Sequence, residues 1–564
     1  MFWYSFGCTF KDALFDPFKR TLMRRLSILP TALSSLVVAG MITVVSLGLA
    51  PSVVAQGVPC SAGKVTSMSS GAQHDCNNVS LLAHVTPGNM GQATGLNDIW
   101  GWSDDESDLE VVLSGWSDGV SVIDVTNPGN PMYIALIPKT PGTNRSTWRD
   151  IKVYGHYAFI TAEPGSGSGS TPIPHGIQIV DLSVLRGHTG PRVVLTPVTT
   201  YTEVNFAHNI VINEEAGFAY AVGSSGGESC GGGLHAIDIR NPEVPAFAGC
   251  ISDVRTARGY THDAQCVVYR GPDLDHSGKE VCFAANENAV SIVDVTDKAN
   301  PEYLGIASYA TSQYVHQAWL SEDPRFLFQN DELDEFRLPN LITHTRTMIW
   351  DVADLEDPVL VKEFFAANTS IDHNLYVKGN FMYQSNYIDG LRVLDVSDPS
   401  SITETAFFDS HPISFTSVWD GSWSNYPFLR SGAVAINSDA GNQASNSDKG
   451  GVYIVCINGQ TCTSQSVDTD EEAEVPSRVQ LEPAYPNPFN PQTTIRYSVP
   501  QTMTVRIAVS DALGREVALL VDGNQVQAGS HSLLFDASAL PSGTYLVRLE
   551  TELGTETRQI VLLK

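Results

Sequence analysis

The most regular feature of the chain is a segment of alternating apolar and polar residues that ends in Asp. A seventh copy of this segment, at 452–456, lacks the Asp. Several copies continue into a turn such as 126–128, where an Asx side chain and Pro end the strand. The copies that carry the Asp lie at 120–125, 177–182, 234–239, 290–295, 348–352 and 391–396.

A second column of residues precedes the first in every unit, with a polar residue just before an apolar or small one. A further strand lies between the two columns, and a fourth follows the turn, so each unit of about 54 residues predicts four short antiparallel strands. This pattern predicts an all-β fold, with a seven-bladed β-propeller over residues 56–462. The polar column comprises Asp98, Asp150, Asn209, Asp263, Gln317, Asn374 and Asp420.

The two ends of the predicted propeller complement each other. The last unit ends after Cys456 without a fourth strand, while an isolated strand at 79–83 precedes the first unit. We expect the N-terminal strand to complete the last blade, because this closes the ring and removes an exposed sheet edge.

The repeated phrases, such as Val-Ser-Val-Ile-Asp-Val at 120–125, resemble the LVIVD repeat. The whole arrangement is similar to the choice-of-anchor B family, whose exported propellers carry differing C-terminal attachment modules. The resemblance covers about residues 60–462. It implies the propeller fold and brings no established reaction with it.

The C-terminal part has a different pattern. Residues 463–477 are acidic and poor in apolar residues, which indicates a linker, and the strands of 478–564 predict a small immunoglobulin-like β-sandwich. The opening Tyr-Pro-Asn-Pro-Phe-Asn-Pro at 485–491, with the motifs at 511–515, 540–545 and 560–564, resembles the type A sorting domain of type IX secretion. The resemblance implies that the type IX machinery carries the chain from the periplasm to the cell surface or medium. An adhesive sandwich module is the alternative.

The N-terminal segment, residues 1–55, indicates export from the cytoplasm. Two arginines precede an apolar run at 26–50, and small residues stand before a cleavage site expected after Ala55. The run is also long enough for an uncleaved anchor. Translation starting at Met23 would account for the unusual first 22 residues.

Eight cysteines follow this segment, an even number that indicates disulfides in an exported protein. Cys266 and Cys282 lie equally far from a turn near Leu274, and Cys230 and Cys250 bracket Arg240 in the same way. We predict these two bridges from antiparallel pairing. Proximity alone suggests pairing Cys60 with Cys76 and Cys456 with Cys462.

Four successive units place a histidine just before the polar column: His208, His262, His316 and His373. If that column lies on the innermost strand, the four imidazoles surround one side of the axial channel, with Asp263 close by. Neutral imidazole is a common ligand of transition metals. The alternative is that these side chains bond the backbone of the inner strands.

The chain has two acidic segments, of which the first suggests calcium. Asp273, Asp275, Ser277 and Glu280 space oxygen atoms like the start of a calcium loop, but Ala284 stands at the twelfth position, where an EF-hand has an acid. A polar turn at the tip of the predicted hairpin is the alternative. For the second segment, 331–335, we expect a solvated loop.

Charge and composition exclude several functions. The formal net charge of −29 would repel a nucleic acid. Neither glycine-rich segment, 165–170 or 223–233, has the Lys-Ser or Lys-Thr of a phosphate-binding loop, and the sequence contains no Gly-x-Ser-x-Gly elbow. Trp100, Trp102 and Trp116 could stack on sugars, although Trp in a propeller blade more often packs in the core.

The sequence therefore predicts an exported, monomeric propeller that binds an extracellular protein or glycan without catalysis. The competing hypothesis is a metal-dependent extracellular enzyme that uses the channel histidines. A structural cell-envelope protein is a third possibility. Replacement of the histidines separates the first two hypotheses, because only the enzyme would lose metal and activity together.

Overall fold

The computed structural model describes residues 57–165, 172–412, 418–440, 449–460, 462 and, apart from single positions, 479–564. The expected signal segment, the linker and Cys8 lie outside the described residues. None of the helices in the described part of the chain has the length and apolar composition that a membrane crossing requires.

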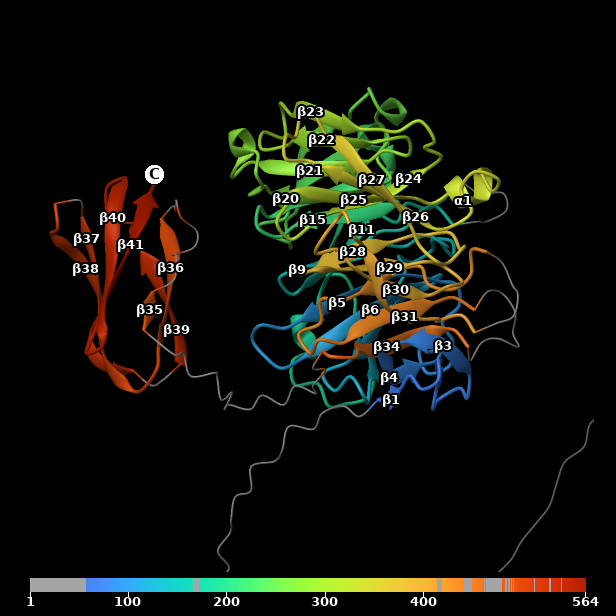
Figure 1. The fold of residues 1–564 in the computed structure, drawn as a ribbon, viewed down its shortest axis with the longest axis horizontal. Coiled ribbons are helices and arrows are strands. Elements are labelled where there is room, and N and C mark those ends of the chain that lie inside the picture. The colour runs from blue at the N-terminus through green and yellow to red at the C-terminus, as the bar shows by residue number, and fades with distance from the viewer. Residues whose placement is uncertain are drawn as a thin grey trace, which may run out of the picture. The chain divides into compact units, whose positions relative to one another are not determined.

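Before residue 463, the described residues form seven mainly antiparallel sheets of four to six strands, as many as the repeat units, and one two-stranded sheet (Figure 1). The predicted all-β fold is confirmed. Their main strands are β5 (Leu96–Ser103), β6 (Glu110–Trp116), β7 (Gly119–Asp124) and β8 (Met132–Pro138); β9 (Ile151–Tyr154), β10 (Tyr157–Ile160), β11 (Ile177–Asp181) and β13 (Thr199–Tyr201); β15 (Asn209–Asn213), β16 (Phe218–Val222), β18 (Leu234–Asp238) and β19 (Ala246–Ile251); β20 (Asp263–Val268), β21 (Glu280–Ala285), β22 (Val290–Asp294) and β23 (Glu302–Ala307); β24 (Val315–Leu320), β25 (Phe326–Asp331), β26 (Arg346–Asp351) and β27 (Val359–Phe365); β28 (Leu375–Lys378), β29 (Phe381–Ser385), β30 (Leu391–Asp395) and β31 (Thr403–Phe408); β32 (Asn425–Tyr426), β33 (Val434–Ser438), β34 (Gly451–Ile457) and β4 (Val79–Val85).

Short elements fill the connections. They are strands β1 (Val58–Pro59), β2 (Lys64–Thr66), β3 (Gln73–Asn77), β12 (Val193–Val194), β14 (Val204–Phe206) and β17 (Ser225–Gly227), the single-turn helix α1 (Asp334–Arg337), and 3-10 turns at Ser183–Leu185, Cys230–Gly232, Ala257–Gly259 and Leu274–His276.

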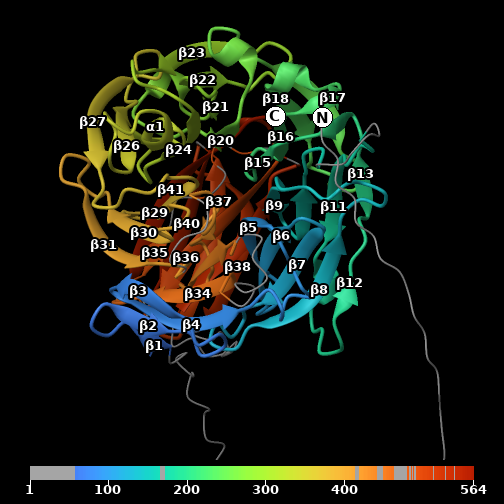
Figure 2. The same cartoon turned by 90° about the vertical axis from the view of Figure 1, so that its right-hand side faces the viewer.

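The sheets follow one another around a ring (Figure 2). Neighbouring sheets touch through their inner strands: β5 contacts β9, β9 contacts β15, β15 contacts β20, β20 contacts β24, and β24 contacts β28, while β32 and β33 contact β5. The space that these inner strands surround is called the axial channel below.

The ring closes as predicted. The N-terminal strand β4 pairs antiparallel with β34, for example at Tyr453 and His84, and so supplies the outer strand that the last unit lacks (Figure 2). The strand β3 adds to the preceding sheet through β31. Residues 57–85 therefore join two sheets built from the C-terminal end of the propeller.

The polar column links the inner strand of one sheet to that of the next. A single buried side chain such as Gln317 bonds to neighbours on both sides, since its amide nitrogen donates to Asp263 and its oxygen accepts from a backbone N–H. These bonds satisfy polar groups next to the channel, where water is scarce. Similar bonds join Ile210 N to the Asp150 carboxylate and the Asn209 amide to the carbonyl of His262.

Both disulfides predicted from antiparallel pairing are present, and so are the two pairings that only proximity suggested. Cys266 and Cys282 face each other on β20 and β21, as the antiparallel pairing requires. Cys230, in the 3-10 turn before β18, is joined to Cys250 on β19, and the other two bridges fix the two ends of the propeller.

The C-terminal part forms two sheets that share one apolar core. Two motifs of the predicted sorting domain have structural roles, because Asn487 bonds to the backbone of β41 and the Asp511 carboxylate accepts from two N–H groups of its own turn. The strands are β35 (Gln480–Leu481), β36 (Gln492–Val499) and β39 (Gly529–Asp536) in one sheet, and β38 (Glu516–Val526), β37 (Met503–Asp511), β40 (Gly543–Thr551) and β41 (Gly554–Leu562) in the other.

Candidate functional site: histidines in the axial channel

The structure brings the four predicted histidines into one continuous arc. Each precedes or begins the inner strand of its own sheet, so equivalent backbone positions present them to the channel. Ring centroids are 4.3 Å apart for His208 and His262, 4.2 Å for His262 and His316, and 4.1 Å for His316 and His373. Neighbouring imidazoles are therefore in contact.

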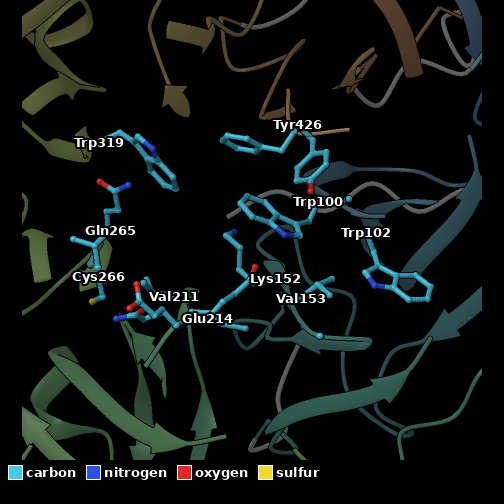
Figure 3. Close-up of a pocket in the computed structure, with 18 of the residues that line it drawn as sticks. Trp100, Trp102, Lys152, Val153, Val211, Glu214, Gln265, Cys266, Trp319 and Tyr426 are labelled. Atoms are coloured by element: carbon cyan, nitrogen blue, oxygen red, sulfur yellow. The ribbon is translucent and has the colours of Figure 1, made fainter. Parts of the chain in front are cut away.

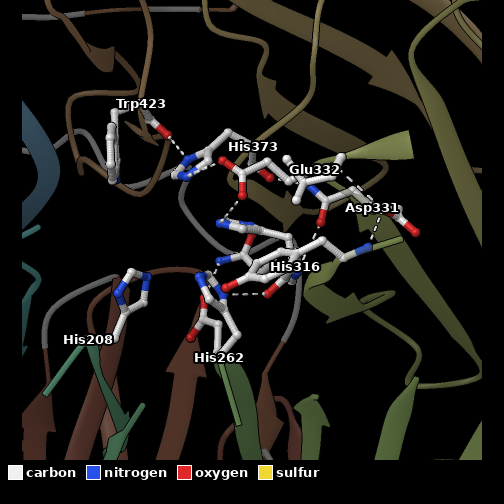
Figure 4. Close-up of polar contacts among 12 residues, drawn as sticks. His208, His262, His316, Asp331, Glu332, His373 and Trp423 are labelled. Atoms are coloured by element: carbon white, nitrogen blue, oxygen red, sulfur yellow. Dashed lines mark hydrogen bonds and ion pairs between the residues drawn. The ribbon is translucent and has the colours of Figure 1, made fainter. Parts of the chain in front are cut away.

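Three of these imidazoles are held through Nδ1, and Figure 4 shows the contacts of His262 and His373. The Nδ1 of His262 lies 3.0 Å from the carbonyl of His316, and that of His373 lies 2.6 Å from the carbonyl of Trp423. The Nδ1 of His208 lies 2.6 Å from the carboxylate of Glu163. A carbonyl oxygen only accepts, so Nδ1 of His262 and His373 carries the proton and Nε2 keeps its lone pair. Histidines that bind metals are oriented in the same way.

Glu332 adds a carboxylate that the sequence analysis missed. Its two oxygens lie 4.0 Å from Nε2 of His316 and 3.7 Å from Nε2 of His373, and Tyr387 donates a hydrogen bond of 2.5 Å to one of them. One ligand atom from each of His316, Glu332 and His373 lies within 4.8 Å of the others. The three side chains thus converge on one point.

Our expectation of a solvated loop at 331–335 is wrong. Asp331 and Asp334 are fully buried and Glu335 is 8% exposed. Asp331 accepts hydrogen bonds from backbone N–H groups and from Tyr309, and Asp334 forms an ion pair with the buried Arg346. This network fixes the position of Glu332, the residue directly after β25.

Burial determines the charge of the site. It lowers the pKa of His373 to about 3 and that of His262 and His316 well below the usual value, so these imidazoles are neutral at pH 7. Burial also raises the pKa of the Glu332 carboxyl to about 7, against the opposing effect of the Tyr387 hydrogen bond. Nδ1 of His316 has no hydrogen-bond partner in the described part of the chain.

The arc faces a cavity of about 590 Å³. Two neutral imidazoles and one carboxylate suit a divalent transition metal, since imidazole binds Zn, Cu, Fe and Ni, and three-ligand sites leave a position for water or substrate. Aromatic side chains make up much of the remaining wall: Trp148, Tyr260, Tyr314, Tyr387, Trp419 and Trp423.

Asp263 does not join the histidines, contrary to our prediction. Its carboxylate accepts from Gln317 and lines a second cavity, whereas the preceding residue, His262, lines the histidine cavity. Successive side chains of an extended strand point in opposite directions, so the two neighbours are directed apart.

The predicted calcium loop does not enclose one point either. The side chain of Glu280 is buried, at 5% exposure. It accepts hydrogen bonds from Tyr220 and Asn213 and forms an ion pair with Lys298. Asp273 caps its own turn by accepting from the N–H of Asp275. In the described part of the chain Asp273, Asp275, Ser277 and Glu280 do not converge, so the polar turn is the better interpretation. Asp273 lies instead within ligand distance of His276 and Glu356.

Comparison with known families decides what the tail is. Residues 483–563 match the secretion system C-terminal sorting domain. The tail is a type IX sorting domain. Residues 373–409 match the LVIVD repeat, which agrees with the phrases in the propeller. The sorting domain indicates export by type IX secretion to the cell surface or the extracellular space, and it implies contact with the secretion machinery.

Comparisons of whole chains are less specific. No curated protein matches the chain at a significant level. Similar solved structures include a functionally unknown protein from Desulfotomaculum acetoxidans (14% identity, 54% of this chain and 83% of that chain, TM-score 0.36). A Lactobacillus plantarum protein has 10% identity, covers 78% and 98%, and has a TM-score of 0.38. A hypothetical selenium-binding protein from Sulfolobus tokodaii has 13% identity, covers 77% and 95%, and has a TM-score of 0.40.

Proposed function

We propose that this exported propeller is a metalloprotein that binds a divalent transition metal in its axial channel. The ligands are Nε2 of His316, Nε2 of His373 and the Glu332 carboxylate. The observation that carries the proposal is the convergence of these three atoms within 4.8 Å, next to a cavity. One of the three ligands, Glu332, lies outside the repeated histidine column. The repeat alone therefore does not explain why the three groups converge.

The surrounding residues have the roles expected around a metal. The carbonyl of Trp423 fixes the tautomer and orientation of His373, and Tyr387 holds one oxygen of Glu332. A bound metal would supply a Lewis acid that polarises a substrate oxygen or lowers the pKa of a water. The cavity gives a small extracellular substrate access to the remaining coordination position.

Backbone bonding alone is the competing account of the histidines. It explains Nδ1 of His262 and His373, which bond to carbonyls. It does not explain the placement of Nε2 of His316 and His373 on either side of a carboxylate whose side chain is only 15% exposed. Glycan or protein binding without a metal would leave this carboxylate without a role.

Metal content tests the proposal. The secreted full chain is loaded with Zn²⁺, Fe²⁺, Cu²⁺ or Mn²⁺, dialysed and measured by elemental analysis. We expect about one tightly held ion per chain for one of these metals. The double variant His316→Asn/His373→Asn should lose the ion, and Tyr387→Phe should weaken its affinity about 10- to 100-fold.

The matched control is His276→Asn, which changes the buried histidine of the other cluster, Asp273, His276 and Glu356. This variant should keep the ion. Near-UV circular dichroism checks that each variant is folded. If the double variant does not fold, the nearly isosteric variant Glu332→Gln replaces it and should also lose the ion. Absence of a retained ion in the wild type, or its retention in the double variant, would overturn the proposal.

A further inference from the structure

A second cavity of about 580 Å³ lies at the other end of the inner strands. The histidine cavity is lined by residues at or before the start of these strands, such as Leu96 and His316, whereas the second one is lined by later residues, such as Trp100 and Trp319. The two cavities therefore approach the channel from opposite ends and share no lining residue.

Aromatic side chains form one wall of this second cavity (Figure 3). The rings of Trp100 and Tyr426 lie 5.1 Å apart, and those of Tyr426 and Phe428 lie 5.5 Å apart. Tyr376, which is buried behind them, contacts both Trp100 at 5.7 Å and Trp319 at 5.1 Å. Edge-to-face packing fixes these rings, so their exposed faces are preorganised for a ligand.

Polar groups converge on the same space. The Lys152 ammonium lies 4.5 Å from the centre of the Trp100 ring and donates to Asp150 at 2.6 Å and Asp98 at 3.3 Å, which uses two of its three N–H donors. The amide oxygen of Gln265 accepts from Leu320 N, and its two N–H donors have no partner in the described part of the chain. These donors line the same cavity as the aromatic rings.

The charges limit the chemistry of the ligand. The carboxyl groups of Asp98, Asp150 and Asp263 lie close to the single ammonium of Lys152, so the cavity does not attract an anion. The face of Trp100 near Lys152 already has a cation over it, so a cationic ligand would compete with this ammonium. An uncharged ligand with an apolar face and many hydroxyl groups fits best.

We infer that this cavity binds a neutral pyranose, such as the terminal sugar of a glycan. The C–H face of the ring stacks on Trp100 or Trp319, while its hydroxyls accept from Lys152 and Gln265. The volume is in the range of ordinary small-ligand sites. This site is independent of the proposed metal centre, since it uses other residues at the other end of the channel.

An array of neutral, sialylated and sulfated glycans tests the inference with the labelled full-length chain. We expect retention on neutral glycans only. Titration calorimetry with the best retained neutral glycan should show that Trp100→Ala and Trp319→Ala each weaken binding about tenfold or more. Gln265→Ala should weaken it less and should leave the core intact, because Gln265 is only partly buried.

Two matched controls separate this site from the metal centre. Trp148→Ala removes an aromatic ring from the histidine cavity, and His316→Asn/His373→Asn removes the metal ligands; neither should change glycan affinity. Retention on anionic glycans only, no retention on any glycan, or unchanged affinity in a folded Trp100→Ala/Trp319→Ala variant would overturn the inference.

Discussion

At the scale of single residues, Lys152 shows how the channel manages buried charge. Its side chain is 14% exposed and lies between Asp98 and Asp150, which are 4% and 3% exposed. Burial raises the pKa of the Asp98 carboxyl well above its usual value and that of Asp263 to about 6, although the ammonium opposes this shift. The negative charge of the three carboxyl groups is thus balanced by one ammonium group.

Lys152→Met should destabilise the propeller by roughly 3–5 kcal/mol at pH 7, because the variant leaves buried carboxylates unpaired. The loss should be smaller at pH 5. Without the ammonium the folded-state pKa values of Asp98 and Asp263 rise further above the unfolded values near 4, so protonation on acidification favours the folded variant.

Urea denaturation of the wild type and variant at both pH values measures this difference. Lys64→Met is the control, since Lys64 pairs with Asp75 on the surface and an exposed pair contributes at most about 1 kcal/mol. Equal stability of Lys152→Met and the wild type at pH 7 would show that the charge network is unimportant.

The histidines of the site could be predicted from the sequence, whereas their carboxylate partner could not. Four histidines at one repeat position must occupy equivalent places on neighbouring inner strands. Glu332 follows β25, outside both repeat columns, and its acidic neighbours indicated a solvated loop. Their burial depends on Arg346, a partner fixed only by the tertiary fold. No feature of the repeat marks this segment as buried, because the Pro turn of each unit follows its third strand and β25 is the second.

At the scale of secondary-structure elements, the pairing of β4 with β34 closes the ring and contains a buried histidine. The ring of His84 stacks on Tyr453 at 4.0 Å, its Nε2 donates to the carbonyl of Gly450, and its Nδ1 lies 2.8 Å from the Ser67 hydroxyl. Burial lowers the pKa of His84 to about 4, despite the opposing bond to Gly450.

This strand pairing should weaken in acid. The unfolded His84 binds a proton near pH 6.5 and the folded one only near pH 4, so its contribution is complete above pH 6.5 and is lost as the pH falls toward 4. Between pH 7 and pH 4.5 the loss from this residue is about 2–3 kcal/mol of unfolding free energy.

Comparison with His84→Gln isolates the contribution of this one residue. The variant cannot titrate, so its unfolding free energy should fall about 2 kcal/mol less than that of the wild type over the same pH range. His188→Gln, which changes a surface ring bonded to the carbonyl of Pro191, is the control and should follow the wild type. Parallel pH profiles for His84→Gln and the wild type would refute the assignment.

The order of the elements was the most predictable part of the fold. The alternating segments and the missing last strand predicted both the sheets and the closure by β4, because strand pairing follows hydrophobic alternation. The small strands β1, β2, β3 and β12, which extend three of the sheets, were not predicted. They have only two to five residues and no repeat pattern, so their pairing depends on the edges that the folded ring offers.

At the scale of the whole molecule, the C-terminal domain serves export and the propeller carries both candidate ligand sites. Deletion of residues 478–564 should leave a folded propeller that accumulates in the periplasm, since the sorting domain is the part that the type IX machinery requires. Cell fractionation and immunoblotting of the truncated and full chains measure this. The Lys152→Met chain, which retains the tail, checks that reduced stability alone does not block export. Surface or medium localisation of the truncated chain would contradict the role of the tail.

The most direct test of the metal centre is a crystal structure of the loaded propeller with data collected at the absorption edge of the bound metal. The account predicts one anomalous peak between Nε2 of His316, Nε2 of His373 and the carboxylate of Glu332, at about 2.0–2.2 Å from the ligand atoms if the ion is zinc. A peak at Asp273, His276 and Glu356 instead, or none in the axial channel, would contradict it.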